Sequence, residues 1–166
     1  MSAIINEAKD HSALRFERKL NTMEKSLLSV IDRPRLLVVD DDPLTSALLT
    51  SIADTTGYNV VQVSDGREAY RILKLDSNFR AAIFNTNLPH LKGVDLLRYM
   101  KTEKRLMRIP VVVVSGAQRL KTMSDSFAAG AVAFLPKPLT AARLHSTVRL
   151  AISTNRESRR VLRPAA

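Results

Sequence analysis

Cysteine is absent from the 166 residues of the chain. A disulfide framework, a thiolate metal site and a cysteine nucleophile are therefore all excluded, and the absence fits a reducing compartment. Long apolar runs are missing as well. No segment approaches the roughly 18 consecutive apolar residues that a membrane helix requires, and the first residues hold no signal-peptide run. We therefore expect a soluble cytoplasmic protein that does not contact a membrane.

The remaining composition is that of an ordinary globular protein, with 45% hydrophobic and 25% charged residues. The length suits one domain with appendages. The net charge is +10, and residues 141–166 hold six of the 26 basic residues but one of the 16 acidic ones. Such a tail is most simply a solvated segment. It could also attract nucleic acid or an acidic surface through a rough stripe of Arg149, Arg156, Arg160 and Arg163.

From Arg35 onward, short apolar runs alternate with segments of helical periodicity. Near-continuous, valine-rich runs indicate strands that are buried on both faces, as in a parallel sheet. The sequence therefore predicts a doubly wound α/β fold with five strands and five helices. The strands are expected at Leu36 to Asp40, Tyr58 to Val63, Ala81 to Asn85, Val111 to Ser115 and Ala131 to Pro136.

Residues 1–33 lie outside this repeat and carry a heptad-like apolar stripe. The spacing predicts an extra N-terminal helix, which either packs on its own domain or pairs with a second subunit. Arg33-Pro34 marks the break before the domain. We expect the domain to span 34–152 and a basic tail to span 153–166. The stripe consists of Ala13, Phe16, Leu20, Met23, Leu27 and Val30.

Polar side chains close the predicted strands. In a sheet of flavodoxin-like order 2-1-3-4-5, ligands bind beyond the carboxyl ends of the strands, so these side chains should converge. Carboxylates suit Mg²⁺, whereas a hydroxyl and an ammonium suit the oxygens of a phosphoryl group. The pattern therefore predicts a phosphoryl site. Its members are Asp40, Asp41, Asn85, Ser115 and Lys137.

Four segments in order resemble the receiver domains of bacterial response regulators, the CheY-like superfamily. They are VVDDDP from Val38, IFNTNLPHLKG from Ile83, VVVVSG from Val111 and AGAVAFLPKPL from Ala129. The resemblance covers about 35–152 and implies a non-enzymatic module of two-component phosphorelay signalling.

The same resemblance assigns roles to individual residues. Mg²⁺ would be held by Asp40, Asp41, residue 85 and the backbone carbonyl of Asn87. Ser115 would be the switch hydroxyl, Phe134 the switch aromatic and Lys137 the ammonium that binds phosphoryl oxygen. The Lys137-Pro138 bond would be cis.

Asn85 stands where that family has its phosphoaccepting aspartate. An amide cannot form a stable acyl phosphate, so the nucleophile is missing, and Mg²⁺ should bind more weakly to the less charged site. Two explanations fit: a natural receiver that no longer takes phosphate, or an aspartate changed to asparagine by engineering.

The leading hypothesis is a receiver that acts through protein contacts with a histidine kinase or phosphotransfer protein, a downstream partner and a possible second copy. Its basic face would carry Arg119, Lys121, Arg143, His145 and Arg149. Nucleic-acid binding through the tail is the alternative, although no DNA-binding motif supports it. A phosphohydrolase or kinase ranks last, because the sequence lacks a nucleotide loop and a nucleophile.

Overall fold

The structure is a computed structural model that describes residues 2–117 and 120–161; side chains are described for 11–117, apart from 50, 53 and 54, and for 120–155. The chain divides into two compact units, Met1–Arg33 and Pro34–Ala166.

The first unit is one helix, α1 (Ser2–Ile31), as the heptad-like stripe predicts. It is 30 residues long, and every described side chain from His11 to Ile31 is exposed. The apolar stripe is included: Phe16 is 65% exposed and Leu27 is 62% exposed.

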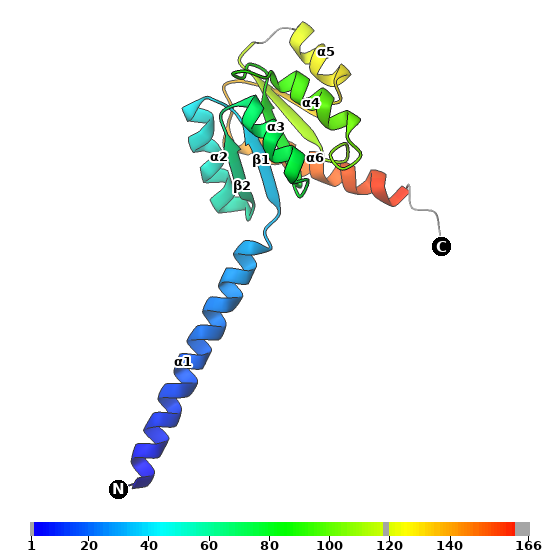
Figure 1. Cartoon of the computed structure of the whole chain (residues 1–166). Coiled ribbons are helices and arrows are strands. Elements are labelled where there is room, and N and C mark those ends of the chain that lie inside the picture. Colours follow the sequence, from blue (N-terminus) through cyan, green and yellow to red (C-terminus); the bar gives the residue numbers. More distant parts are fainter. Residues whose placement is uncertain (1, 118–119, 162–166) are drawn as a thin grey trace. The chain divides into compact units, whose positions relative to one another are not determined.

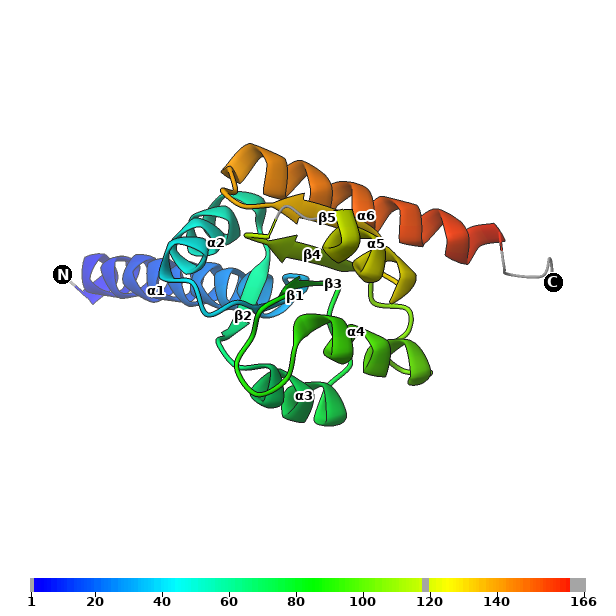
Figure 2. The same cartoon turned by 90° about the horizontal axis from the view of Figure 1, so that it is seen from above.

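The second unit is built on a five-stranded sheet in the order β2-β1-β3-β4-β5, in which every neighbouring pair is parallel (Figures 1 and 2). This is the doubly wound, flavodoxin-like order that the sequence predicts. The strands are β1 (Arg35–Val39), β2 (Asn59–Val63), β3 (Ala81–Asn85), β4 (Val111–Ser115) and β5 (Ala133–Pro136).

Helices cover both faces of the sheet, so each strand contributes side chains alternately to two cores (Figure 2). Leu36 and Val38 pack with α2 (Pro43–Thr56) and α6 (Ala141–Val161). Leu37 and Val39 face the opposite core, formed with α3 (Gly66–Leu75), α4 (Gly93–Thr102) and the two alanines, Ala129 and Ala131, that follow α5 (Leu120–Ala128). Helix α6 continues through Val161, into the residues that the sequence assigns to the tail.

The three central strands are nearly or fully buried on both faces, as their valine-rich runs predict, whereas the edge strands are not. In β2 only Val63 is buried, and in β5 only Leu135, because each edge strand has a single neighbour. The last strand also begins at Ala133 rather than at Ala131. The Ala131 N–H donates back to the Ser126 carbonyl at 3.0 Å, so the chain there still completes the turn that ends α5.

The turn residues position the strand ends. Asp42 caps α2 by accepting from the Leu44 N–H, and Gly57 closes that helix with a left-handed φ of 73°. Asp65 caps α3 by accepting from the Arg67 N–H. Among the described residues, no helix has the length and apolar character needed to cross a bilayer.

Candidate functional site

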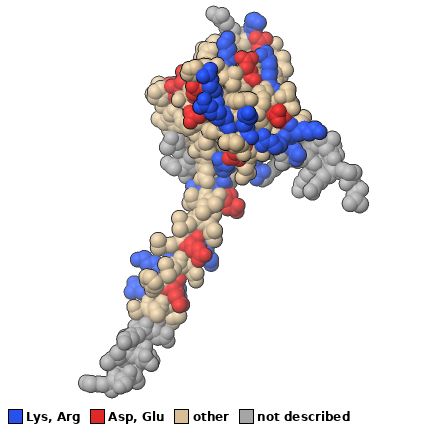
Figure 3. All heavy atoms as spheres, viewed as in Figure 1, with Lys and Arg blue, Asp and Glu red and all other residues tan. Residues whose placement is uncertain are grey.

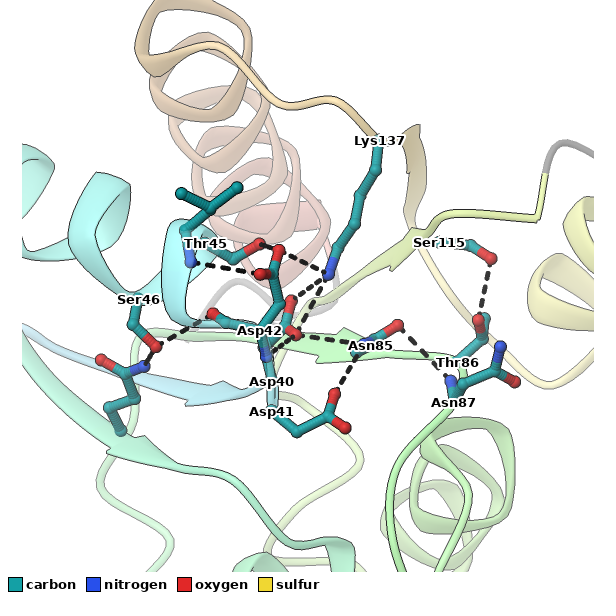
Figure 4. A network of polar contacts seen from close by, with 12 residues as sticks. Asp40, Asp41, Asp42, Thr45, Ser46, Asn85, Thr86, Asn87, Ser115 and Lys137 are labelled. Carbon is teal, nitrogen blue, oxygen red and sulfur yellow. Dashed lines mark hydrogen bonds and ion pairs between the residues drawn. The ribbon is translucent and has the colours of Figure 1, made fainter.

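The carboxyl ends of the strands bring together most of the polar residues that the sequence singled out (Figure 4). Asp40 and Asp41 follow β1, Asn85 ends β3, Ser115 ends β4 and Lys137 follows β5. In the order β2-β1-β3-β4-β5, these side chains come from the ends of four adjacent strands, β1, β3, β4 and β5. The parallel order therefore produces the convergence that the strand ends predict.

Asp40 is the buried centre of this network, with 1% exposure. Its Oδ1 accepts hydrogen bonds from Asn85 Nδ2 at 3.0 Å, from the Asp42 backbone N–H at 3.0 Å and from Lys137 Nζ at 3.1 Å. Its Oδ2 lies 2.9 Å from the same Nζ as an ion pair but accepts no hydrogen bond of good geometry. A buried carboxylate needs such compensation, and Lys137, with 17% of its side chain exposed, supplies the charge.

Asn85 links the two carboxylates that follow β1. Its side-chain Nδ2 donates to Asp40 Oδ1 at 3.0 Å and to Asp41 Oδ1 at 3.3 Å, while its Oδ1 accepts from the Asn87 backbone N–H at 3.4 Å. Asn85 is 7% exposed, and Asp41 is exposed. The amide nitrogen thus lies between the two carboxylates (Figure 4).

Asp42 has two roles in the structure, as the N-cap of α2 and as a partner of Lys137. Besides capping α2, its Oδ2 accepts from the Thr45 hydroxyl at 2.8 Å and lies 3.5 Å from Lys137 Nζ. The Thr45 hydroxyl, with the Leu44 N–H, holds the pKa of Asp42 below its ordinary value. Lys137 therefore bridges Asp40 and Asp42. The only sequence signal for the pairing of Lys137 with Asp42 is the run of three acidic residues after β1.

Ser115 is fully buried and its hydroxyl is already engaged. It accepts from the Thr86 hydroxyl at 2.8 Å and from the Ala117 N–H at 3.1 Å, and donates to the Ala117 carbonyl at 3.4 Å. Sequence reasoning missed Thr86, since a threonine after a strand is a common residue that carries no motif of its own.

Two further predicted residues lie nearby. Phe134 sits on β5, half-buried against the core that contains α3 and α4, and does not join the polar network. Asn87 has an exposed side chain and follows Thr86 directly. The Lys137-Pro138 bond is cis, as expected.

The acidic donors are few for a metal. Among the described residues, no group of three or more histidine, cysteine, aspartate or glutamate side chains is placed to hold an ion. Asp40 and Asp41 nevertheless both accept hydrogen bonds from the Asn85 amide. If that amide turned its oxygen toward them, the two carboxylates and the amide oxygen would be a donor set that fits a cation. Arg119, Arg163 and the side chains of Arg156 and Arg160 lie outside the described residues.

Comparison with known proteins decides the family. Residues 36–149 match the family described as the response regulator receiver domain. The chain belongs to this family. Its curated relatives include the cell cycle transcriptional regulator CtrA of Caulobacter vibrioides, 29% identical over 119 residues, which are 69% of this chain and 50% of CtrA. The two-component response regulator ORR3 of rice (Oryza sativa) is 31% identical over 106 residues, 64% of this chain and 81% of ORR3. The chain thus spans about half the length of CtrA.

Solved receiver structures agree with the observed fold. The CheY-like receiver of Methanospirillum hungatei superposes with a TM-score of 0.70 at 24% identity, over 76% of this chain and 99% of its own. The receiver of a histidine kinase from Syntrophus aciditrophicus gives a TM-score of 0.66 at 29% identity, covering 80% and 96%. The receiver of the sensor kinase PA1611 of Pseudomonas aeruginosa, at 0.66 and 23%, covering 73% and 98%, holds a magnesium ion in its active-site cleft. This chain is therefore a receiver domain of two-component signalling, a kind of module that is typically not an enzyme.

Proposed function

We propose that this receiver works without phosphorylation on residue 85 and transmits its signal through protein contacts in the cytoplasm. The supporting observation is the position of Asn85. Its amide donates to both Asp40 and Asp41 at the end of β3, where a receiver would carry its phosphoaccepting carboxylate. The Asn85 amide bridges the two carboxylates by hydrogen bonds. Because residue 85 is an asparagine, the site also has no carboxylate nucleophile at this position.

The chemistry of phosphoryl transfer supports this proposal. A carboxylate can attack phosphorus and form an acyl phosphate with only a metal ion and an ammonium to neutralise charge. An amide oxygen is a weaker nucleophile and gives no stable product. Lys137 keeps the position suited to a phosphoryl oxygen, but its ammonium is already neutralised by Asp40 and Asp42.

Magnesium binding should be weakened in this receiver. Asp40, Asp41, the Asn85 side-chain oxygen and the Asn87 carbonyl would hold the ion, as expected for the family. When bound, Mg²⁺ would neutralise charge between the two carboxylates. The Asn85 amide would first have to turn and give up both hydrogen bonds to those carboxylates. Neutral Asn85 also brings no charge of its own, which lowers the affinity further.

We propose that Ser115 is the switch hydroxyl and Phe134 the switch aromatic of this receiver. The Thr86 hydroxyl holds Ser115 at 2.8 Å, so the switch hydroxyl is fixed without a phosphoryl group. Phe134 is half-buried and packs on the core beside it. A receiver with these residues fixed in one arrangement would present a constant surface to its partners.

The partner surface that we propose lies on α5, β5 and α6. Its basic members Lys121, Arg143 and Arg149 are exposed, and His145 is partly exposed. Leu120 and Phe127, 80% and 46% exposed, add apolar contact area on α5. An acidic partner surface fits the exposed Lys121, Arg143 and Arg149 best.

A second surface lies beside the site itself. A hollow of about 480 Å³ is bounded by Asp42, Lys137 and apolar side chains of α2 and the β5–α6 loop. We assign it to a histidine kinase or phosphotransfer protein, since it gives direct access to Lys137. A second copy of the chain is a further candidate partner. The apolar lining consists of Leu44, Leu48, Pro138 and Leu139.

The first prediction tests the missing nucleophile. We expect that acetyl phosphate with Mg²⁺ leaves the chain unmodified, whereas Asn85→Asp accepts one phosphoryl group. In the variant, a carboxylate oxygen forms the new bond to phosphorus as the bond to acetate breaks, and acetate leaves. Intact-protein mass spectrometry measures the added mass.

Asn87→Asp is the matched control, because it adds the same carboxylate two residues away on an exposed side chain, and it should stay unmodified. A phosphorylated species on the unaltered chain, or an Asn85→Asp variant that stays unmodified, would contradict the proposal.

A further inference from the structure

Helix α1 presents a continuous apolar stripe, and charged residues of opposite sign lie on the two flanks of that stripe. The stripe residues recur at steps of three and four, so they occupy alternating a and d positions of a heptad. In this assignment a is 13, 20 and 27, and d is 16, 23 and 30. The stripe is exposed along its whole length, with Leu20 at 50% and Met23 at 57%. An exposed apolar row of this length on a 30-residue helix calls for a partner.

The positions beside the stripe carry charges of opposite sign on opposite flanks. Glu17 and Glu24 occupy the e positions on one flank, and Lys19 is the charged residue at a g position on the other. All three are exposed, and none forms an ion pair within the described part of the chain. Figure 3 shows acidic and basic side chains interspersed with uncharged ones along the described part of the helix. Their charges are therefore available to a partner helix.

We propose that α1 pairs with α1 of a second copy as a parallel two-stranded coiled coil. In a parallel pair, each g residue lies beside the e residue five positions later on the partner helix. Lys19 then meets Glu24 of the second copy, and the symmetric contact forms on the other side. In an antiparallel pair, e residues face e residues, so Glu17 and Glu24 would repel. The charge pattern therefore selects the parallel arrangement.

The orientation has a consequence for the receiver units. Because each chain leaves the coiled coil at Arg33, a parallel pair delivers both receivers at the same end of the helices, whereas an antiparallel pair would deliver them at opposite ends. The seam holds only three a and three d positions on each helix, so we expect a weak dimer that dissociates on dilution. This inference does not depend on the chemistry of Asn85.

Charge reversal on the full chain tests both the dimer and its orientation. We expect that Lys19→Glu and Glu24→Lys each raise the dimer dissociation constant about tenfold, because each reversal turns two attractive contacts into two repulsive ones. The double variant Lys19→Glu with Glu24→Lys should restore the original affinity. Sedimentation velocity over a wide range of concentration measures all three. Lys25→Glu, at an f position away from the seam, is the control for the change in net charge and should leave the affinity unchanged.

Cross-linking gives an independent measure of orientation, because the chain contains no cysteine of its own. In a parallel pair, residue 13 of one helix lies beside residue 13 of the other, so Ala13→Cys should form a disulfide-linked dimer on mild oxidation. His11→Cys, at an f position, should not. A chain that stays monomeric into the high micromolar range overturns the proposal. So does an antiparallel result, in which Glu24→Lys strengthens the dimer and Ala13→Cys gives no cross-link.

Discussion

At the scale of single residues, the site depends on a few hydrogen bonds whose direction the sequence does not specify. The four motif segments locate Asp40, Asn85 and Lys137 within one site, and the structure brings them within hydrogen-bonding distance. The sequence could not show that the Asn85 nitrogen, rather than its oxygen, faces the carboxylates. That choice follows from the local surroundings, because two acceptors lie on one side of the amide and the Asn87 N–H lies on the other.

Asp42 provides a prediction about pH. In the folded chain its pKa is lowered from 3.8, chiefly by the Thr45 hydroxyl and then by the Leu44 N–H. A lowered pKa stabilises the fold at pH values above that of the unfolded state, and the contribution is lost as the pH falls through the folded pKa. Asp42→Asn keeps a capping oxygen but removes the charge. We expect it to lower the free energy of unfolding at pH 7 by less than about 1 kcal/mol, since the side chain is partly solvated.

Urea unfolding from pH 7 down to pH 3 tests this expectation. The difference between the two proteins should be constant above the ordinary aspartate pKa and shrink below it. A difference that grows as the pH falls would mean that the charge on Asp42 destabilises the fold.

At the scale of elements, the sequence predicts the strands well where they are buried on both faces and less well at the sheet edges. The expected β3 and β4 agree with the observed bounds residue for residue. The sequence predicts the start of β5 two residues early, because Ala131 and Val132 continue an apolar run although the turn after α5 is not yet complete. Apolar periodicity alone cannot distinguish a strand from such a turn, since the turn also contains apolar residues, of which Ala131 is buried and Val132 is 50% exposed.

The contact between β3 and α4 depends on one glycine. A Cβ at Gly93 would lie 2.1 Å from the Asn85 carbonyl oxygen, whereas real atoms of this kind stay beyond 3 Å. We expect Gly93→Ala to destabilise the receiver by about 1–3 kcal/mol, because either the start of α4 or the end of β3 must move. Thermal unfolding of the purified variant measures the loss.

Gly116→Ala is a suitable control, since a Cβ there meets nothing within 4 Å and its φ is not left-handed. Equal melting temperatures for the two variants would show that the close approach at Gly93 relaxes without cost.

At the scale of the whole molecule, the fold and the polar site are linked, because the sheet order that buries the core also brings Asn85 and Lys137 to the three consecutive aspartates that follow β1. In the unaltered chain, the Lys137 ammonium neutralises Asp40 and Asp42, and the Asn85 amide donates hydrogen bonds to Asp40 and Asp41. Replacing the amide with a carboxylate removes two hydrogen bonds and adds a like charge a few ångströms from Asp40. Residue 85 should therefore determine both the stability of the metal-free receiver and its response to Mg²⁺.

We expect Asn85→Asp to lower the free energy of unfolding at pH 7 without metal by about 2 kcal/mol, because hydrogen bonds to charged acceptors are lost and replaced by repulsion. In a domain of this size, that loss lowers the melting temperature by on the order of 5–10 °C.

Millimolar Mg²⁺ should then stabilise the Asn85→Asp variant more than the unaltered chain, since stabilisation by a ligand follows its affinity for the folded state. Melting curves of both proteins, with and without Mg²⁺, measure the two effects together. They share one cause, the charge of residue 85 between Asp40 and Asp41, so they must appear together. Equal shifts with metal, or a variant that is more stable than the unaltered chain without it, would mean that residue 85 does not face the two carboxylates in solution.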